Sequence, residues 1–350
     1  MTSNGLLRYR PTWGAVVASV ALLALCPLFV GDFFLSAILT QAMWLGIAAL
    51  SLIFLAGYGG MVSLAQVGLF GVAGFTYANL VFADGGVKVA WNPWLAAVVA
   101  ILAATAIGLF FGAVASRSLG IYFLMITLAL GVIVQFFFEK VTQLSGFGGV
   151  NQVDRPDIVS APRTDPDNIF FISLVVALAL FLLVKYVTRT PFGIALQGIR
   201  DDPTRMRALG YNVELHRIVA FGFAAFVAGV AGVLFVWWST RIDPGSVNIG
   251  SILDVLVVAV IGGLFRLEGA WVGAIAFVTL DNYARDLGFV GPQFNTLIGL
   301  VFLGIVLLSP GGLLGIWEAV RSYVKRQAGG GGSDGASDEP SEPAVVEPGG

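Results

Sequence analysis

The stretch TRTPFGIALQGIRDDPTRMRALGYNVELHR, residues 188–217, lies between two long apolar runs and contains arginines, two adjacent aspartates and the only histidine of the chain. Across all 350 residues, 57% are hydrophobic and 11% are charged. A soluble domain has about 25% charged residues, so this composition indicates a membrane protein with several spans. The topology then depends on which side of the membrane holds the polar stretch.

About ten runs approach the ~20 apolar residues that a spanning helix needs. The predicted fold class is therefore an all-α, polytopic transmembrane helical bundle with eight to ten spans. The first run follows Arg8 and Arg10, as in a signal peptide, but no small-x-small cleavage site follows it, so it is interpreted as a retained helix. The predicted spans are residues 13–30, 34–56, 61–82, 93–115, 121–138, 169–187, 218–238, 249–264, 270–283 and 293–309.

The distribution of Lys and Arg predicts the orientation, because cytoplasmic loops carry an excess of these residues. With a cytoplasmic N-terminus and ten spans, thirteen of the 19 Lys and Arg fall inside the cell. Both termini and the 188–217 stretch are then cytoplasmic. Residues 327–350 are rich in Gly, Ser, Pro and acidic residues, which predicts a disordered cytoplasmic tail after a transmembrane domain of residues 1–326.

A short helix is predicted at the start of the polar stretch. Thr190 can cap it, and Pro191 takes the first helical position, where its missing N–H costs nothing. An apolar face then follows at helical spacing and is expected to point into the cytosol. The members of this face are Phe192, Ala195, Leu196 and Ile199.

A second short helix is predicted directly after the first. Asp202 precedes Pro203 and can cap this helix, which runs to Gly210 as the residue that ends it. The whole stretch is interpreted either as a basic loop on lipid headgroups or as a docking element for a cytoplasmic partner. The chain has no G-x-x-x-x-G-K-[ST] loop for nucleotide binding, so any ATP hydrolysis that drives it must take place in another subunit.

At these residues the sequence resembles the permease subunits of branched-chain amino-acid ABC importers of the LivM type. The segment PFGIALQGIRDDPTRMRALGYNVELHRIVAFGFAAFVAGVAGVLF (191–235) is similar to the coupling loop and following helix of that family. The resemblance covers roughly residues 35–316 in order. Four further segments carry it: GYGGMVSLAQVGLFGVAGF (57–75), LGIYFLMITLAL (119–130), SILDVLVVAVIGGLFRLEGAWVGA (251–274) and TLIGLVFLGIVLLSPGGLLG (296–315).

The resemblance implies a subunit of an ATP-driven importer of branched-chain or other apolar amino acids in the bacterial inner membrane, working by alternating access. It implies as partners two cytoplasmic ATP-binding subunits, a second related permease and an extracytoplasmic substrate-binding protein. No cofactor, metal, nucleic acid or catalysis by this chain is expected. The coupling-loop residues it implies are Pro191, Phe192, Gly193, Ala195, Leu196, Ile199, Arg200, Asp202, Arg205, Ala208, Leu209 and Gly210.

Three positions depart from the pattern of the family. Arg205-Met206 replaces the paired small residues that usually precede Ala-Leu-Gly, which points to a differently tuned ATPase interface. Ala65-Gln66 replaces the Gly-His that usually follows Ser-Leu, which leaves the substrate open. Phe265 stands where a glycine is expected after Gly-Gly-Leu.

The translocation path is expected beside the third predicted span, where three glycines lie within the span and three more lie directly before it (Gly57, Gly59, Gly60, Gly68, Gly71 and Gly74). Glycine weakens a helix by about 1 kcal/mol, so these residues either break the span to offer backbone groups to a substrate or allow close helix packing. Asp254 is a further candidate, because ionisable groups inside a span are functional by default. The path candidates are Gly59, Gly60, Ser63, Gln66, Asp254, Gly262 and Gly263.

Other functions remain open at this point. The resemblance also allows a urea or short-amide permease and, more distantly, a ribose-type sugar permease. A proton-coupled transporter would need a coupling acid, for which Asp254 is the candidate. A membrane enzyme is disfavoured, since the chain has no H-E-x-x-H or G-x-S-x-G motif and a single cysteine, Cys26.

Overall fold

The computed structural model describes residues 34–81, 89–118, 120–145, 148–159 and 166–286, with residues 299, 303, 304, 312, 313 and 315. The predicted spans 13–30 and 293–309 and the predicted tail thus lie almost wholly outside the described residues. The elements are η3 (Phe34–Leu39), α2 (Thr40–Gly59), α3 (Gln66–Leu80), α4 (Pro93–Ala115), α5 (Ile121–Lys140), α6 (Thr142–Ser145), α7 (Pro166–Val187), α8 (Pro191–Asp201), α9 (Pro203–Ala208), α10 (Val213–Ser239), η4 (Pro244–Val247), α11 (Ile249–Gly262) and α12 (Gly269–Asp286).

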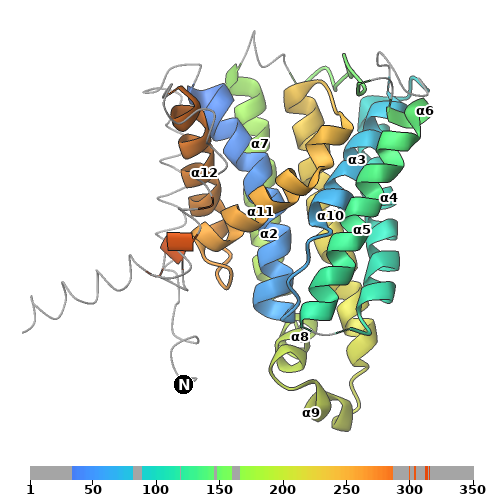
Figure 1. The fold of residues 1–350 in the computed structure, drawn as a ribbon, viewed down its shortest axis with the longest axis vertical. Coiled ribbons are helices and arrows are strands. Elements are labelled where there is room, and N and C mark those ends of the chain that lie inside the picture. The colour runs from blue at the N-terminus through green and yellow to red at the C-terminus, as the bar shows by residue number, and fades with distance from the viewer. Residues whose placement is uncertain are drawn as a thin grey trace, which may run out of the picture.

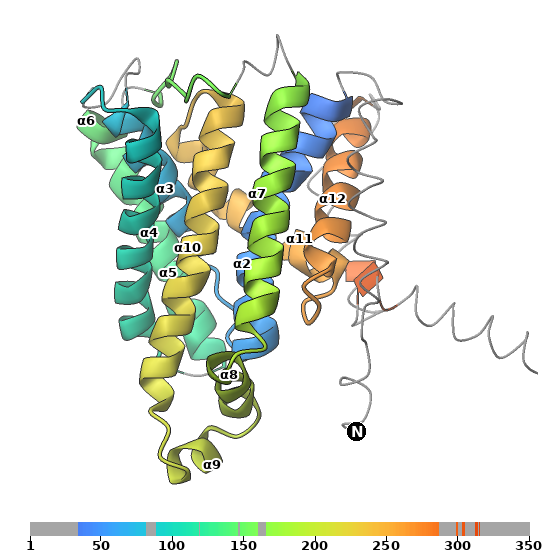
Figure 2. The same cartoon turned by 180° about the vertical axis from the view of Figure 1, so that it is seen from behind.

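The described part of the chain is a bundle of roughly parallel and antiparallel helices, with α8 and α9 projecting together from one end (Figures 1 and 2). The helices α2, α4, α5, α7 and α10 are long and apolar enough to cross a membrane. Of these, α2 is the most enclosed, with 89% of its apolar window buried, whereas the value for α5 is 28%. The predicted all-α, multi-span fold class is confirmed, with α2 and α10 in the centre and α4 and α5 at the periphery.

The third predicted span does not begin as a helix. α2 ends at Gly59, Gly60 has a φ of +65°, and residues 61–65 form no helix before α3 begins at Gln66. A φ in the left-handed region is accessible to glycine at little cost, so Gly60 terminates α2 and lets the chain change direction. The predicted span 61–82 is therefore corrected to a buried non-helical segment followed by a 15-residue helix.

Most other glycines in the bundle allow close packing between helices. A Cβ on Gly232 of α10 would lie 2.1 Å from the carbonyl oxygen of Phe70 in α3, and one on Gly108 of α4 would lie 2.1 Å from the Cβ of Ala225 in α10. These separations are shorter than any real contact, so the helix axes can approach this closely only at glycine. Glycine thus brings α3, α4 and α10 together as one unit.

Candidate functional site

The helices α8 and α9 begin at the capping residues expected from the sequence. The hydroxyl of Thr190 accepts a hydrogen bond from the N–H of Gly193 at 3.4 Å, and Pro191 is the first residue of α8. The carboxylate of Asp202 accepts from the N–H groups of Thr204 and Arg205 at 3.0 and 2.9 Å. These caps satisfy N–H groups that have no partner within a helix, so local chemistry fixes both starts.

The end of α9 is also local in origin. Gly210 has a φ of +89°, the N–H of Gly210 donates to the carbonyl of Arg207, and the N–H of Tyr211 donates to the carbonyl of Met206. This pair of bonds is a Schellman motif, in which a left-handed glycine closes a helix. The predicted second helix and its terminal glycine are confirmed, although residues 213–217 of the predicted loop belong to α10.

The apolar face of α8 points into the protein, contrary to the expectation from the sequence. Leu196 and Ile199 are each 0% exposed and Ala195 is 5% exposed, while Phe192 is half-buried and stacks on the ring of His216. A short helix at one end of the bundle can bury its apolar face against the ends of the long helices, and α8 packs against α2 and α10 in this way. Leu196 and Ile199 therefore hold α8 in place and are not available to a partner.

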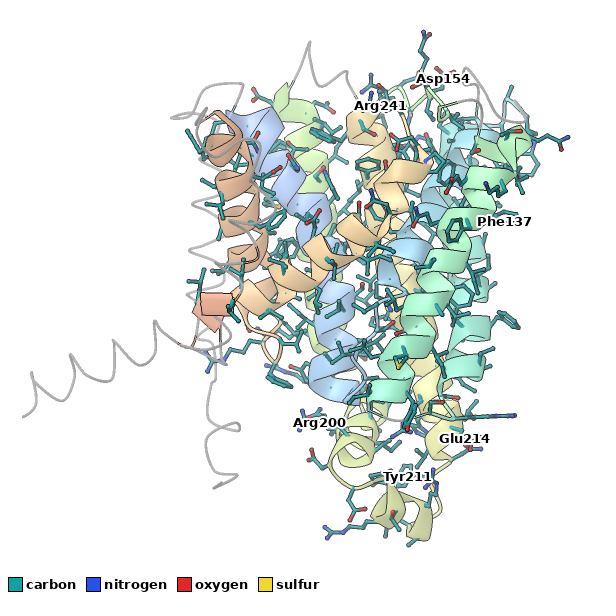
Figure 3. All side chains as sticks on the ribbon, viewed as in Figure 1. Phe137, Asp154, Arg200, Tyr211, Glu214 and Arg241 are labelled. Carbon is teal, nitrogen blue, oxygen red and sulfur yellow. The ribbon has the colours of Figure 1, made fainter. Side chains whose placement is uncertain are left out.

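The exposed apolar side chains lie elsewhere on the loop. Leu209, directly after α9, is 67% exposed, Ile194 on the outer face of α8 is 62% exposed, and Tyr211 is 44% exposed. Ala208 and Arg205 are exposed beside them, and Figure 3 shows Tyr211 at the tip of the projecting end. This end of the molecule therefore presents a surface of mixed apolar and basic residues.

Arg200 connects α8 to the end of α2. Its guanidinium Nη1 donates a hydrogen bond to the carbonyl of Gly57, and its Nη2 lies 2.9 Å from the carboxylate of Asp201. The last carbonyls of a helix have no intrahelical partner and attract a cation, so Arg200 caps α2 from another element. Its Cγ would lie 2.6 Å from a Cβ placed on Gly60, so α8 and the break after α2 are in direct contact.

The loop between α11 and α12 meets the same end of α2. The Cα of Gly57 faces the carbonyl oxygen of Leu264, which would lie 3.4 Å from an added Cβ. The ammonium of Lys185 at the end of α7 lies 3.5 Å from the carboxylate of Glu268 in that loop. The end of α2 thus contacts α8 on one side and the α11–α12 loop on the other.

Ser63 and Gln66 are enclosed at the break between α2 and α3. Ser63 is 0% exposed and Gln66 is 1% exposed, and the Gln66 Nε2 donates to the Ser63 hydroxyl at 3.4 Å. The N–H of Leu64 donates to the hydroxyl of Thr127 on α5 at 3.2 Å. Gln66 Oε1 has no hydrogen-bond partner among the described residues. Side-chain hydroxyls thus replace part of the backbone bonding that the missing helical turn would supply.

The other path candidates separate into two groups. Gly59 and Gly60 lie against α8, and a Cβ on Gly262 would lie 1.8 Å from the carbonyl oxygen of Gly269, so this glycine permits the contact between α11 and α12. Gly263 ends α11 with a φ of +116°. Only Asp254, of the predicted path residues, lines a described cavity, which it shares with Asp281.

A loop at the opposite end, residues 148–159, is attached to α3 and α10. The hydroxyl of Tyr77 donates to the carbonyl of Asp154 at 2.8 Å, and Arg155 donates to the carbonyl of Trp237 at 3.3 Å. Burial lowers the pKa of Arg155, while the neighbouring Tyr77 and Asp154 act in the opposite direction. Val150 pairs with Ile242 in an antiparallel bridge, so this loop and the segment after α10 form one cover (Figure 3).

Comparisons with known proteins agree with this architecture. The family described as "Branched-chain amino acid transport system / permease component" matches residues 34–309. The LivM permease protein of the high-affinity branched-chain amino acid transport system of Escherichia coli (strain K12) is 28% identical over 306 residues, covering 79% of this chain and 69% of its own.

Two further relatives point the same way. LivM of Salmonella typhimurium is 26% identical and is matched over 83% of this chain and 72% of its own. The "Probable branched-chain amino acid transport permease protein LivH" of Methanocaldococcus jannaschii is 27% identical over 45% of this chain and 51% of its own. With the multi-span fold and the family match over most of its length, the chain belongs to the permease components of branched-chain amino acid transport systems.

Proposed function

We propose that this protein is the transmembrane subunit of an ATP-driven importer in the bacterial inner membrane, carrying branched-chain or other apolar amino acids. Its partners in this proposal are two ATP-binding subunits in the cytoplasm, a second related permease and an extracytoplasmic binding protein. Family membership supports the class of transporter, and the names of the relatives support the class of substrate.

The observation that carries the proposal is the exposed surface of α9 and the residues around it. Leu209 and Tyr211 are large side chains that project from the end of the bundle, and burying their apolar surface against a partner would lower the free energy of the complex. Aromatic and arginine side chains beside an apolar contact are typical of protein interfaces. We place the ATP-binding subunit on this surface, with Leu209 at its centre.

The contacts of Arg200 can transmit a movement of this surface to α2 within the membrane. When the ATP-binding subunits close, they displace α9 and, with it, α8. Because Leu196 packs against Gly59 and Arg200 holds the carbonyl of Gly57, α8 cannot move without acting on the end of α2. The non-helical residues 61–65 follow directly and can absorb the change in backbone angles, as hinge segments do.

The test uses the complete transporter, reconstituted in vesicles with its ATP-binding subunits, second permease and binding protein. Leu209→Asp should abolish co-purification of the ATP-binding subunit and ATP-dependent uptake of radiolabelled leucine, because a carboxylate would be buried in the interface without a partner. Ile158→Asp is the matched control, since Ile158 is 64% exposed at the opposite end and should leave co-purification intact.

The alternatives are distinguished by the same vesicles. Uptake of labelled urea without uptake of leucine would replace the proposed substrate with a short amide. Uptake that persists without ATP and collapses on addition of an uncoupler would replace ATP-driven import with proton coupling. Normal co-purification of the Leu209→Asp variant would show that the ATP-binding subunit does not dock on α9.

A further inference from the structure

A cavity of about 250 Å³ lies among α2, α3, α10, η4, α11 and α12. Its α2 residues, Gln41 to Ala48, belong to the first half of that helix, whereas α8 contacts the last turn. The cavity therefore lies in the half of the bundle remote from the coupling loop. At ~30 Å³ per water it has room for about eight water molecules, which is comparable with a small organic molecule of eight or nine heavy atoms.

Two carboxylates from different helices line this cavity. Asp254 projects from α11 and Asp281 from α12, and both side chains are half-buried. The described lining residues include no Lys, Arg or His, so its charge is negative wherever these carboxylates are ionised. Each aspartate also interacts within the protein, but an ionised carboxylate has about four lone-pair sites and can accept further N–H donors.

An aromatic wall forms another side of the cavity. The rings of Trp44 and Phe235 meet edge to face with centroids 4.9 Å apart, and Phe70 lies 5.3 Å from Phe235 and 5.8 Å from Trp44. Aromatic faces carry negative charge density and attract cations, most strongly where water is excluded. They also provide apolar surface for a hydrocarbon side chain.

We propose that this cavity is a binding site for the primary ammonium group of a small apolar amine, with Asp254 and Asp281 accepting its N–H groups and the aromatic wall covering its hydrocarbon part. Ionisable residues within a membrane bundle usually mark substrate pathways, and a buried cation needs such acceptors. The choice of leucine as the natural occupant rests on the proposed function, whereas recognition of the ammonium group does not.

Three probes that share one hydrocarbon skeleton separate the two ends of the ligand. Leucine has both an ammonium and a carboxylate, 3-methylbutylamine has only the ammonium, and 4-methylpentanoate has only the carboxylate. The full chain, purified in lipid nanodiscs without the binding protein, is titrated with radiolabelled 3-methylbutylamine, and unlabelled leucine and 4-methylpentanoate are tested as competitors. We expect competition by leucine and none by 4-methylpentanoate.

Variants then locate the site. Asp254→Asn and Asp281→Asn keep the size of the side chain and should each weaken amine binding about tenfold or more, since the acceptor loses the negative charge that strengthens its hydrogen bond to the ammonium. Asp157→Asn, at an exposed carboxylate outside the cavity, is the matched control and should bind as the unmodified chain does. Phe235→Leu leaves both acids in place and should weaken the amine several-fold by removing part of the aromatic wall.

Several outcomes would overturn the proposal. These are equal competition by the carboxylate probe, unchanged amine binding in both aspartate variants, and absence of saturable amine binding to the unmodified chain. None of them bears on whether the complete transporter takes up leucine with ATP. Conversely, if the unmodified transporter takes up no leucine with ATP, the proposed function is wrong, whereas binding of the amine to this cavity is unaffected by that result.

Discussion

Arg200 attaches α8 to the end of α2, a span that is distant in the sequence. The carbonyl it binds, that of Gly57, belongs to the last turn of α2 and has no partner inside the helix. A hydrogen bond to a charged group contributes roughly 1.5–3 kcal/mol, and the partly exposed guanidinium places this one toward the lower limit. That is enough to change an equilibrium between two transporter conformations about tenfold.

Replacing Arg200 with Met should therefore separate ATP hydrolysis from transport. The variant keeps an unbranched apolar stem but loses the guanidinium and its bond to Gly57, so α8 can move without pulling on α2. We expect the ATP-binding subunit to co-purify normally and ATP hydrolysis to continue, while leucine uptake per ATP hydrolysed falls about tenfold.

Arg189→Met is the matched control, because Arg189 is an exposed arginine next to α8, and it should transport as the unmodified chain does. Arg200→Lys should recover part of the uptake, since it restores the charge. Loss of co-purification in Arg200→Met would instead make Arg200 part of the docking surface. Gly60 and this loop are far apart in the sequence, so only the folded structure shows that they are in contact.

At the scale of elements, the packing of α10 on α3 depends on glycine rather than on complementary side chains. A Cβ on Gly232 would meet the carbonyl oxygen, carbon and Cα of Phe70 at 2.1, 2.9 and 3.2 Å. These are backbone atoms within a helix, so relief requires moving one whole helix away from the other. Overpacking of this kind typically costs 1–3 kcal/mol.

Gly232→Ala should lower the thermal unfolding midpoint of the purified chain in detergent. Gly198→Ala is the control within α8, where the new methyl group would meet only the sulfur end of the flexible Met206 side chain at 2.9 Å. Because alanine favours helix over glycine by about 1 kcal/mol, this control should unfold at the same temperature or higher. Equal loss in both variants would show that backbone proximity at Gly232 does not limit stability.

The same elements show how far the sequence could predict the site. Caps such as Thr190, Asp202 and Gly210 follow from local chemistry and were predicted correctly. The direction of the apolar face of α8 was not, because a stripe at helical spacing indicates only that something must cover Leu196 and Ile199. Whether the body or a partner covers them depends on the ends of α2 and α10, which are distant in sequence.

The glycines and the cavity illustrate the same limit. Position 60 requires glycine because its backbone is left-handed, whereas position 232 requires glycine because a Cβ there would clash with α3. The sequence does not distinguish these two reasons. Asp254 could be singled out, because a charge inside a span is rare and costly. Trp44 and Phe235 could not, since aromatic residues in an apolar helix look like any other residue that faces the core or the lipid.

At the scale of the whole molecule, the two ends of the bundle differ in charge. The end that carries α8 and α9 (Figure 1) holds most of the described basic residues, and the opposite end, where Figure 3 labels Arg241, holds few. Loops rich in Lys and Arg remain in the cytoplasm during insertion, so the first end should face the cell interior. The basic residues at that end are Arg117, Lys185, Arg189, Arg200, Arg205, Arg207, Arg217 and Arg266.

This orientation can be measured with single cysteines in intact cells, after Cys26→Ser removes the natural thiol. Arg207→Cys, in exposed α9, should resist a membrane-impermeant maleimide until the membrane is opened, because its thiol lies inside. Asp157→Cys, in the exposed loop at the other end, should react in intact cells. Labelling in the opposite order would show that the bundle has the inverted orientation in the membrane. A cytoplasmic ATP-binding subunit could then not reach α9. The proposed docking surface, the role of the Arg200 contact and the direction of import therefore all depend on this result.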